Sequence, residues 1–355
     1  LRLYKCSMFP VETTKGDLML SECESLGWST RRWHWVAVAT VVALASALPG
    51  VALAQTGYPD KPIRLVVGLA AGGPADTIAR VVGQRMGEVL GQPMVVENRP
   101  GASGNIATDY VARLEADGYT LLMLSTINAS NETLSRSMQY KVGTHFTAIA
   151  HLAETNNVLV VHPSLPAKNM AEFIAHAKAK PQEMFYANAG IGSSTHLTHA
   201  LFDMMAGTKM TAVHYRGGGA AMADLLSGQV KIMFASIAPV IGAVREGKLR
   251  ALSTTGAMRD PAFPELPTVA ESVLPGFETQ LWLGLSVKAG APRIVVDKLA
   301  AAAAQATDTP NVKDRLVKLG FATLSSTPEK FEAFYKSEVA KWAKVVEVTG
   351  MPLQD

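Results

Sequence analysis

The sequence predicts an α/β protein of two lobes, each an open sheet flanked by helices. Short apolar runs alternate with one-sided helical patterns along most of the chain, which is typical of βα units and of a parallel sheet. About 300 residues follow a predicted export leader, more than one hydrophobic core usually supports, and this favours two domains. No linker-like segment separates the pieces, so we expect the chain to cross between the lobes more than once.

Residues 31–54 have the order of a secretory signal peptide. Arg31-Arg32 is followed by an apolar run over residues 36–48, by Pro49-Gly50 and by Ala52-Leu53-Ala54. We expect cleavage after Ala54 and a periplasmic product that begins at Gln55. The alternative is an uncleaved anchor, but the apolar run rises only about 20 Å as a helix, short of the roughly 30 Å of bilayer hydrocarbon. Twin-arginine export also stays open.

Loss of residues 1–54, the predicted N-terminal extension and leader, leaves 301 residues (355 minus 54). Cys6 and Cys23 leave with that segment, which excludes disulfide frameworks, zinc–thiolate clusters and cysteine nucleophiles. The segment also takes five of the 33 basic and four of the 30 acidic residues, so the formal charge becomes 28 minus 26, or +2. This balance gives no electrostatic footprint for nucleic acid or an anionic membrane.

The first lobe is assigned to residues 55–156 and 281–355. Its predicted strands lie at 63–67, 94–97, 120–124 and 281–287. Helices are predicted after the first strand and over residues 105–115. Thr309-Pro310 and Thr327-Pro328 each place a capping hydroxyl before proline at a helix start, and Gly350 is a suitable end for the last helix.

The second lobe is assigned to residues 157–280. Strands are predicted at 158–161 and 185–186, and a helix begins at Asn169. Three further βα units start from strands at 211–215, 230–234 and 249–253.

Three loops join a strand to a helix where open α/β sheets bind ligands. Gly72-Gly73-Pro74-Ala75-Asp76 could hold an anion on the free amides of the helix N-terminus, or Asp76 could merely cap that helix. The loop at 187–196 is of the same kind, and its glycines fit a dinucleotide fingerprint poorly. Arg216-Gly217-Gly218-Gly219 is the only one with a cation, which could bind an anion, although an arginine at the mouth of a loop is more often solvated or paired.

Enzyme motifs are absent from the sequence. It has no G-x-S-x-G elbow and no phosphate loop ending in Gly-Lys-Ser/Thr. His196 and His199 are spaced to ligate a metal from one helix, but no acid completes the set, so a core or capping role is favoured.

The chain resembles the Bug-type (TctC-like) solute-binding proteins of tripartite tricarboxylate transporters over the whole predicted mature region. Family-like segments include Tyr58-Pro59-Asp60-Lys61-Pro62, Gly72-Gly73-Pro74, Glu97-Asn98-Arg99-Pro100-Gly101, Asp117-Gly118-Tyr119, Asp224-Leu225-Leu226, Gly247-Lys248-Leu249, Pro267-Thr268-Val269, Pro275-Gly276-Phe277 and Ala340-Lys341-Trp342.

This resemblance implies a periplasmic binding protein of the Venus-flytrap type, type II-like, that closes over a small carboxylate. The ligand would be a di- or tricarboxylate, an aromatic acid or another organic acid, held by backbone amides and water between pincer loops at 68–76 and 187–196. The expected ligand-binding residues are Leu69, Ala70, Gly72, Gly73, Asp76, Thr126, Ala189, Gly190, Ser193, Thr195, His196 and Arg216. The expected partners are the membrane permease subunits, and we expect a monomer without cofactor, metal or catalytic residue.

Two departures from the family pattern affect the ligand. Gly68-Leu69-Ala70 stands where the family commonly has Pro-Phe-Pro, and Phe234-Ala235-Ser236 where it commonly has Phe-Asp-Asn. Both changes leave side chains that are smaller or less acidic at the cleft. The remaining alternatives are an extracytoplasmic hydrolase that uses His196 and a ligand sensor for a membrane signalling receptor.

Overall fold

The computed structural model describes residues 57–136 and 138–354. The predicted leader and its cleavage point lie outside these residues. Within them, no helix is both long enough and apolar enough to cross a membrane.

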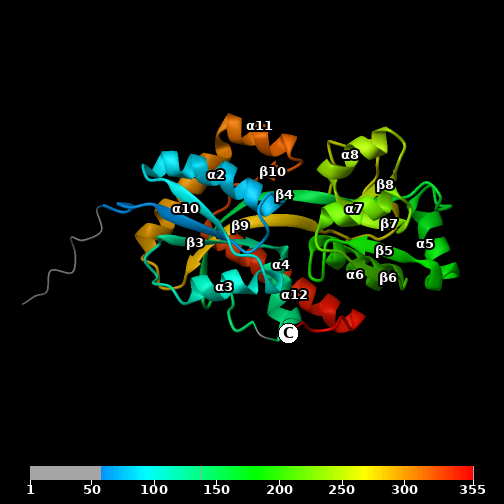
Figure 1. The fold of residues 1–355 in the computed structure, drawn as a ribbon, viewed down its shortest axis with the longest axis horizontal. Coiled ribbons are helices and arrows are strands. Elements are labelled where there is room, and N and C mark those ends of the chain that lie inside the picture. Colours follow the sequence, from blue (N-terminus) through cyan, green and yellow to red (C-terminus); the bar gives the residue numbers. More distant parts are fainter. Residues whose placement is uncertain (1–56, 137, 355) are drawn as a thin grey trace, which may run out of the picture. The chain divides into compact units, whose positions relative to one another are not determined.

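The first part of the chain alternates strands and helices (Figure 1). Its elements are β1 (Ile63–Val67), α2 (Pro74–Leu90), β2 (Met94–Asn98), the 3-10 turn η1 (Ala102–Gly104), α3 (Asn105–Ala112), β3 (Thr120–Ser125), α4 (Thr126–Leu134) and β4 (Phe146–Val161). Helix α4 and most of β4 were not predicted. Helix α4 begins directly where β3 ends, because Ser125 and Asn128 form a capping box there.

The middle of the chain continues this alternation. Its elements are α5 (Met170–Ala179), the 3-10 turn η2 (Pro181–Glu183), β5 (Phe185–Asn188), α6 (Ser194–Ala206), β6 (Thr211–His214), α7 (Gly218–Leu226), β7 (Ile232–Ser236), α8 (Ile237–Arg245), β8 (Arg250–Thr254) and α9 (Val269–Ser272). The predicted strands of this region are all present.

Two strands and three helices complete the fold. These elements are β9 (Gln280–Lys288), α10 (Arg293–Asp308), α11 (Pro310–Lys318), β10 (Ala322–Thr323) and α12 (Pro328–Thr349). The Thr327 hydroxyl caps α12 by accepting a hydrogen bond from the Lys330 amide, as predicted, and Gly350 ends it in the left-handed region. Thr309 does not cap α11 with its side chain, because its hydroxyl donates to the Gln305 carbonyl instead.

The sheet is mixed, whereas the βα pattern predicted a parallel one. Its strand order is β2-β1-β3-β9-β4-β7-β5-β6, and β8 and β10 pair with β4 beside this path. Strand β1 runs parallel to β2 and β3, and β5 runs parallel to β6 and β7. Strand β9 is antiparallel to β3 and β4, and β4 is antiparallel to β7 and β8, because β4 and β9 carry the chain out and back.

Strand β4 belongs to both ends of the sheet. Up to Asn156 it pairs with β9, where Asn156 stands opposite Gln280, and from Asn157 onward it pairs with β7. Strands β4 and β9 therefore connect the β1–β3 end of the sheet to the β5–β7 end. The division into lobes at residues 156/157 and 280/281 stays a prediction.

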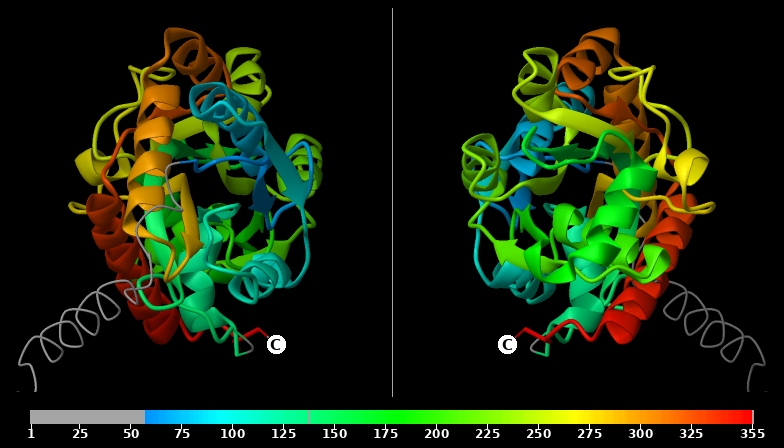
Figure 2. Two further views of the ribbon diagram at one scale, coloured as in Figure 1. Left: turned by 90° about the vertical axis from the view of Figure 1, so that its left-hand side faces the viewer. Right: turned by 90° about the vertical axis from the view of Figure 1, so that its right-hand side faces the viewer.

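Helices cover both faces of the curled sheet (Figure 2). One apolar cluster packs α2, α10 and α11 against β1, β3, β9 and β4. A second cluster lies under α3, α4 and α12 and continues without interruption beneath α5 and α6, where Phe173, Phe202, Phe234 and Phe277 pack together. A third cluster lies beneath α7 and α8.

Candidate functional site

The first predicted loop connects β1 to α2 and lies close to the segment before α3. A Cβ atom on Gly68 would stand 3.0 Å from the Gly104 Cα, so the close approach of these two backbones favours glycine. Gly72 has a φ of +80°, which also favours glycine.

The carboxylate of Asp76 turns back onto its own loop. It accepts a hydrogen bond of 2.9 Å from the Gly72 amide and is paired with Arg80, one turn along α2, at 2.9 Å. Burial of Asp76 opposes its charge, but the hydrogen bonds from Arg80 and Gly72 outweigh this and lower the pKa of the carboxyl. Gly73, not Asp76, is the N-cap residue of α2.

These contacts decide which amides of the first loop are available. The Gly72 amide is used by Asp76, and the Gly73 amide points to the Ala70 carbonyl at 3.4 Å. Within the described residues, no protein acceptor binds the amides of Ala71, Ala75 and Asp76. Of these, the Ala75 and Asp76 amides belong to the free N-terminus of α2 and carry the positive end of its dipole.

The second predicted loop connects β5 to α6 and uses most of its amides internally. The Ala189 amide donates to the Thr195 hydroxyl at 2.9 Å, and the Gly192 amide donates to His196 Nδ1 at 3.2 Å. Ser193 caps α6 by accepting a hydrogen bond from the His196 amide. The side chains of Thr195 and His196 thus hold the loop, and the amides of Ser194 and Thr195 have no protein acceptor within the described part of the chain.

A group of rings, all buried except the exposed His214, supports this second loop. The ring of His196 packs edge-on against His214, with centroids 4.9 Å apart, and Tyr186 stacks on His199. Burial, followed by the nearby His214, lowers the pKa of His196 to about 4. His199 is fully buried, and its Nε2 accepts a hydrogen bond from the Phe234 amide. Both histidines therefore act as neutral acceptors for different backbone amides, which is a core and loop-supporting role.

Both loops lie against helix α4. Ser130 of α4 donates to the Gly192 carbonyl at 3.3 Å, and Asn131 donates to the Ser103 carbonyl at 2.8 Å. A cavity of about 10 Å³ lies between the first loop and α4, lined by Val67, Gly68, Leu69, Ala75, Ser103, Gly104, Met123, Ser125, Ile127 and Asn128. This volume is that of about one water molecule and is too small for an organic acid.

A wider groove lies elsewhere on the surface. It has a volume of about 760 Å³ between α2 and β2 and is lined by Arg80, Gln84, Gly87, Glu88, Gly91, Gln92, Pro93, Met94, Val95 and Val96. None of these residues belongs to either loop, so size alone does not make this groove the ligand site.

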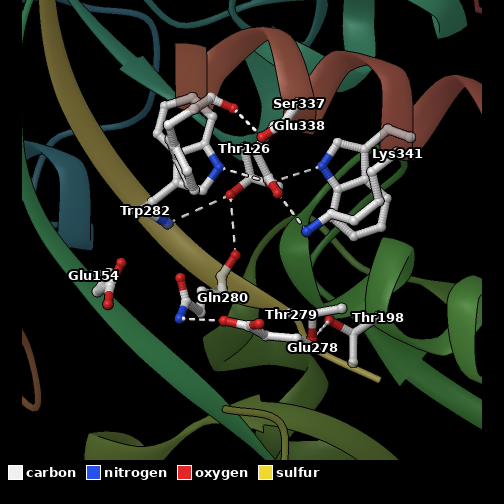
Figure 3. Close-up of polar contacts among 12 residues, drawn as sticks. Thr126, Glu154, Thr198, Glu278, Thr279, Gln280, Trp282, Ser337, Glu338 and Lys341 are labelled. Atoms are coloured by element: carbon white, nitrogen blue, oxygen red, sulfur yellow. Dashed lines mark hydrogen bonds and ion pairs between the residues drawn. The ribbon is translucent and has the colours of Figure 1, made fainter. Parts of the chain in front are cut away.

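The remaining predicted residues take different positions. Leu69 is half-buried, and its carbonyl accepts a hydrogen bond from Asn98, whereas Ala70 is exposed. Thr126 is fully buried, and its hydroxyl donates to the Gln280 carbonyl of β9 at 3.3 Å (Figure 3). Arg216 is exposed and makes no hydrogen bond or ion pair with another described residue.

Sequence reasoning missed a buried polar cluster near the place where the paired strands β4 and β9 lead from one end of the sheet to the other. Thr198 donates to the Thr279 hydroxyl at 2.8 Å, and Asn157 donates to Thr198. Nearby, Glu338 of α12 accepts hydrogen bonds from the indole N–H groups of Trp282 and Trp342, at 2.9 and 3.0 Å (Figure 3). These residues come from segments far apart in the sequence, so no local motif signals them.

The comparison with known proteins identifies the chain by family. Residues 78–351 match the family model described as the tripartite tricarboxylate transporter family receptor. The chain is 33% identical over 318 residues to protein BugT of Bordetella pertussis, an alignment that covers 88% of this chain and 98% of BugT.

Solved structures agree with this match. Rpa4515 of R. palustris, with adipate, is 34% identical and superposes with a TM-score of 0.75, over 83% of this chain and 99% of the other. MatC (Rpa3494) of Rhodopseudomonas palustris, with bound malate, is 33% identical with a TM-score of 0.73, over 81% and 100% of the two chains. These likenesses confirm the predicted binding-protein fold, and the relatives are substrate-binding proteins, not enzymes. The chain therefore belongs to the family of tripartite tricarboxylate transporter receptors, the Bug-type solute-binding proteins.

Proposed function

We propose that this protein captures a small organic carboxylate in the periplasm and delivers it to the permease subunits of a tripartite tricarboxylate transporter. The observation that carries the proposal is the family match over residues 78–351, together with adipate and malate in two relatives of the same fold.

The geometry of the two loops supports a carboxylate as the ligand. Each loop leads into a helix whose first amides have no protein acceptor within residues 57–136 and 138–354, at Ala75 and Asp76 in α2 and at Ser194 and Thr195 in α6. Such amides favour an anion, and each charge-assisted hydrogen bond contributes on the order of 1.5 to 3 kcal/mol net. The other proposed ligand contacts are the remaining loop residues predicted from the sequence, which are Leu69, Ala70, Gly72, Gly73, Ala189, Gly190, Ser193, His196 and Arg216.

Ligand entry requires the loops to separate. The cavity between the first loop and α4 holds about 10 Å³, whereas an organic acid needs several times the volume of one water molecule. We therefore propose an opening that bends the paired strands β4 and β9, followed by closure on the bound acid. Closure should reduce the radius of gyration in solution scattering, and the ligand should raise the melting temperature because it binds the native state.

Calorimetry with a panel of dicarboxylates that includes adipate and malate tests the proposal. Wild-type protein should bind at least one acid, and Gly73→Val should abolish that binding, because its side chain would crowd the free end of α2 and the Ala70 carbonyl, which lies 3.3 Å from the Cβ position. Gly242→Val is the matched control, since Gly242 is an exposed glycine of α8 with open space around it. Undiminished affinity in Gly73→Val would refute the placement of the first loop, and turnover of the acid would refute the assignment as a receptor.

Two parts of the proposal concern the protein in its cell. Export with cleavage after Ala54 predicts a periplasmic product whose N-terminal sequence begins at Gln55, and a product that retains residues 36–48 contradicts it. Capture of the permease subunits by the liganded protein would separate transport from the sensor alternative, in which a signalling receptor is captured instead.

A further inference from the structure

The side chains of Asn98, Arg80 and Asp76 connect two backbone groups of the first loop, the Leu69 carbonyl and the Gly72 amide. Asn98, the last residue of β2, donates from its amide nitrogen to the Leu69 carbonyl at 3.1 Å. Arg80 donates to the Asn98 side-chain oxygen at 3.2 Å and to Asp76 Oδ2 at 3.1 Å. Asp76 Oδ2 in turn accepts the Gly72 amide at 2.9 Å. A closed ring of hydrogen bonds therefore runs from Leu69 through Asn98, Arg80 and Asp76 to Gly72.

The ring fixes the loop at two points. The Leu69 carbonyl is bonded to Asn98 of β2, and the Gly72 amide is bonded to Asp76 of α2. These two hydrogen bonds restrain the backbone between Leu69 and Gly72. Fixed donors bind an anion more tightly than mobile ones, because less conformational entropy is lost when the ligand binds.

The ring of hydrogen bonds also neutralises the charge of Asp76 beside the free amides of α2. Asp76 is 4% exposed and is the second residue after the Pro74 that opens α2, next to the free amides. An uncompensated carboxylate there would repel an anionic ligand in a poorly solvated site. Arg80 neutralises it through two contacts of its planar guanidinium, a geometry that lysine cannot reproduce.

We infer that Arg80 and Asn98 are positioning residues for ligand binding, which hold the first loop in its binding geometry and neutralise Asp76, without contacting the ligand themselves. This inference rests on the proposed function for the place of the ligand. It assigns Asn98 and Arg80 a role that neither residue type nor loop position reveals.

Hydrogen exchange of the loop amides in the ligand-free protein tests the positioning without any ligand. Arg80→Met and Asn98→Ala should each speed exchange at Gly72 by about tenfold or more, because the hydrogen bond from the Gly72 amide depends on a fixed Asp76. Arg85→Met is the matched control: Arg85 lies on the same helix and pairs with Glu88, away from the loop. Exchange at Gly72 that matches wild type in both ring variants overturns the inference.

Calorimetry with adipate and malate tests the charge role. Whichever acid wild type binds should bind Arg80→Met about tenfold to a hundredfold more weakly, and Arg80→Lys should lie between them. The double variant Asp76→Asn with Arg80→Met should recover most of the affinity, because the repelling charge is gone while the asparagine oxygen still accepts the Gly72 amide. A merely structural role for Arg80 predicts no such recovery, and its absence overturns the charge role. Wild type that binds neither these nor any other acid contradicts the proposed function, and the exchange experiment then decides the positioning alone.

Discussion

Acid should destabilise this protein through His196, and the size of the effect follows from its contacts. The imidazole is 5% exposed, its Nδ1 accepts the Gly192 amide, and its pKa is lowered to about 4 by burial and then by His214. Protonation in the folded state would break the Gly192 hydrogen bond and place a charge beside the ring of His214. The folded protein therefore resists a proton that the unfolded chain accepts at a pKa near 6.5.

The sign and magnitude follow from proton linkage. Between pH 6.5 and 4 the unfolded chain binds more protons than the folded chain, so the free energy of unfolding falls as the pH falls through this window. At pH 5 the unfolded imidazole is almost fully protonated and the folded one hardly at all, which corresponds to a loss of about 2 kcal/mol from His196 alone relative to neutral pH. The lowered pKa of His151, caused by burial, adds a loss of the same sign.

Urea denaturation of wild type and His196→Gln at pH 7 and pH 5, followed by the fluorescence of the buried Trp282 and Trp342, isolates the His196 contribution. The variant should lose about 2 kcal/mol less stability between the two pH values than wild type does, whatever its stability at pH 7. His145→Gln, at an exposed histidine, should follow wild type. Equal losses in wild type and His196→Gln would show that His196 is not a buried neutral acceptor.

Two further predictions concern packing. Gly320→Ala should destabilise the protein by about 2 kcal/mol, because Gly320 has a φ of +78° and the new Cβ would lie 2.8 Å from Ala238 of α8. Gly247→Ala is the control: Gly247 has a φ of +71° but open space around it, so the change should cost only about 1 kcal/mol of backbone strain. Equal losses of stability in urea denaturation would contradict the close approach of the α11 turn to α8. Glu338→Ala should lower the free energy of unfolding by about 3 kcal/mol, because it leaves two buried indole N–H groups without an acceptor. Glu338→Gln should lower it less, because glutamine keeps an acceptor oxygen. Thermal melts that rank the two variants the other way would refute this account.

The sequence predicted most elements because their periodicity is local. Strands at 63–67 and 120–124 and the capped helix after Thr327 depend on neighbouring residues alone. The length of β4 was missed because its first part is paired with β9, more than 120 residues away, and its apolar pattern includes the polar residues His151 and Glu154. The mixed sheet follows from the same long-range pairing.

The loops could be located from sequence, but the direction of their side chains could not. A carboxylate at position 76 can face a ligand or its own loop, and the choice depends on Asn98, which the pairing of β1 with β2 brings to the loop. Thr126 illustrates the same limit, because its hydroxyl is directed to Gln280 in a strand that follows more than 150 residues later.

The pairing of Asn156 with Gln280 has a consequence for protein engineering. Because the chain leaves β4 and returns on β9 at adjacent positions, the segment 157–279 has neighbouring ends and could be exchanged as a cassette between relatives with different ligands. Its apolar surface is not self-contained, however, since Phe202, Phe234 and Phe277 belong to the same cluster as Trp342 of α12. A working chimera would therefore have to carry matching residues on α12, and ligand preference in this family should be transferable only together with part of the C-terminal helix.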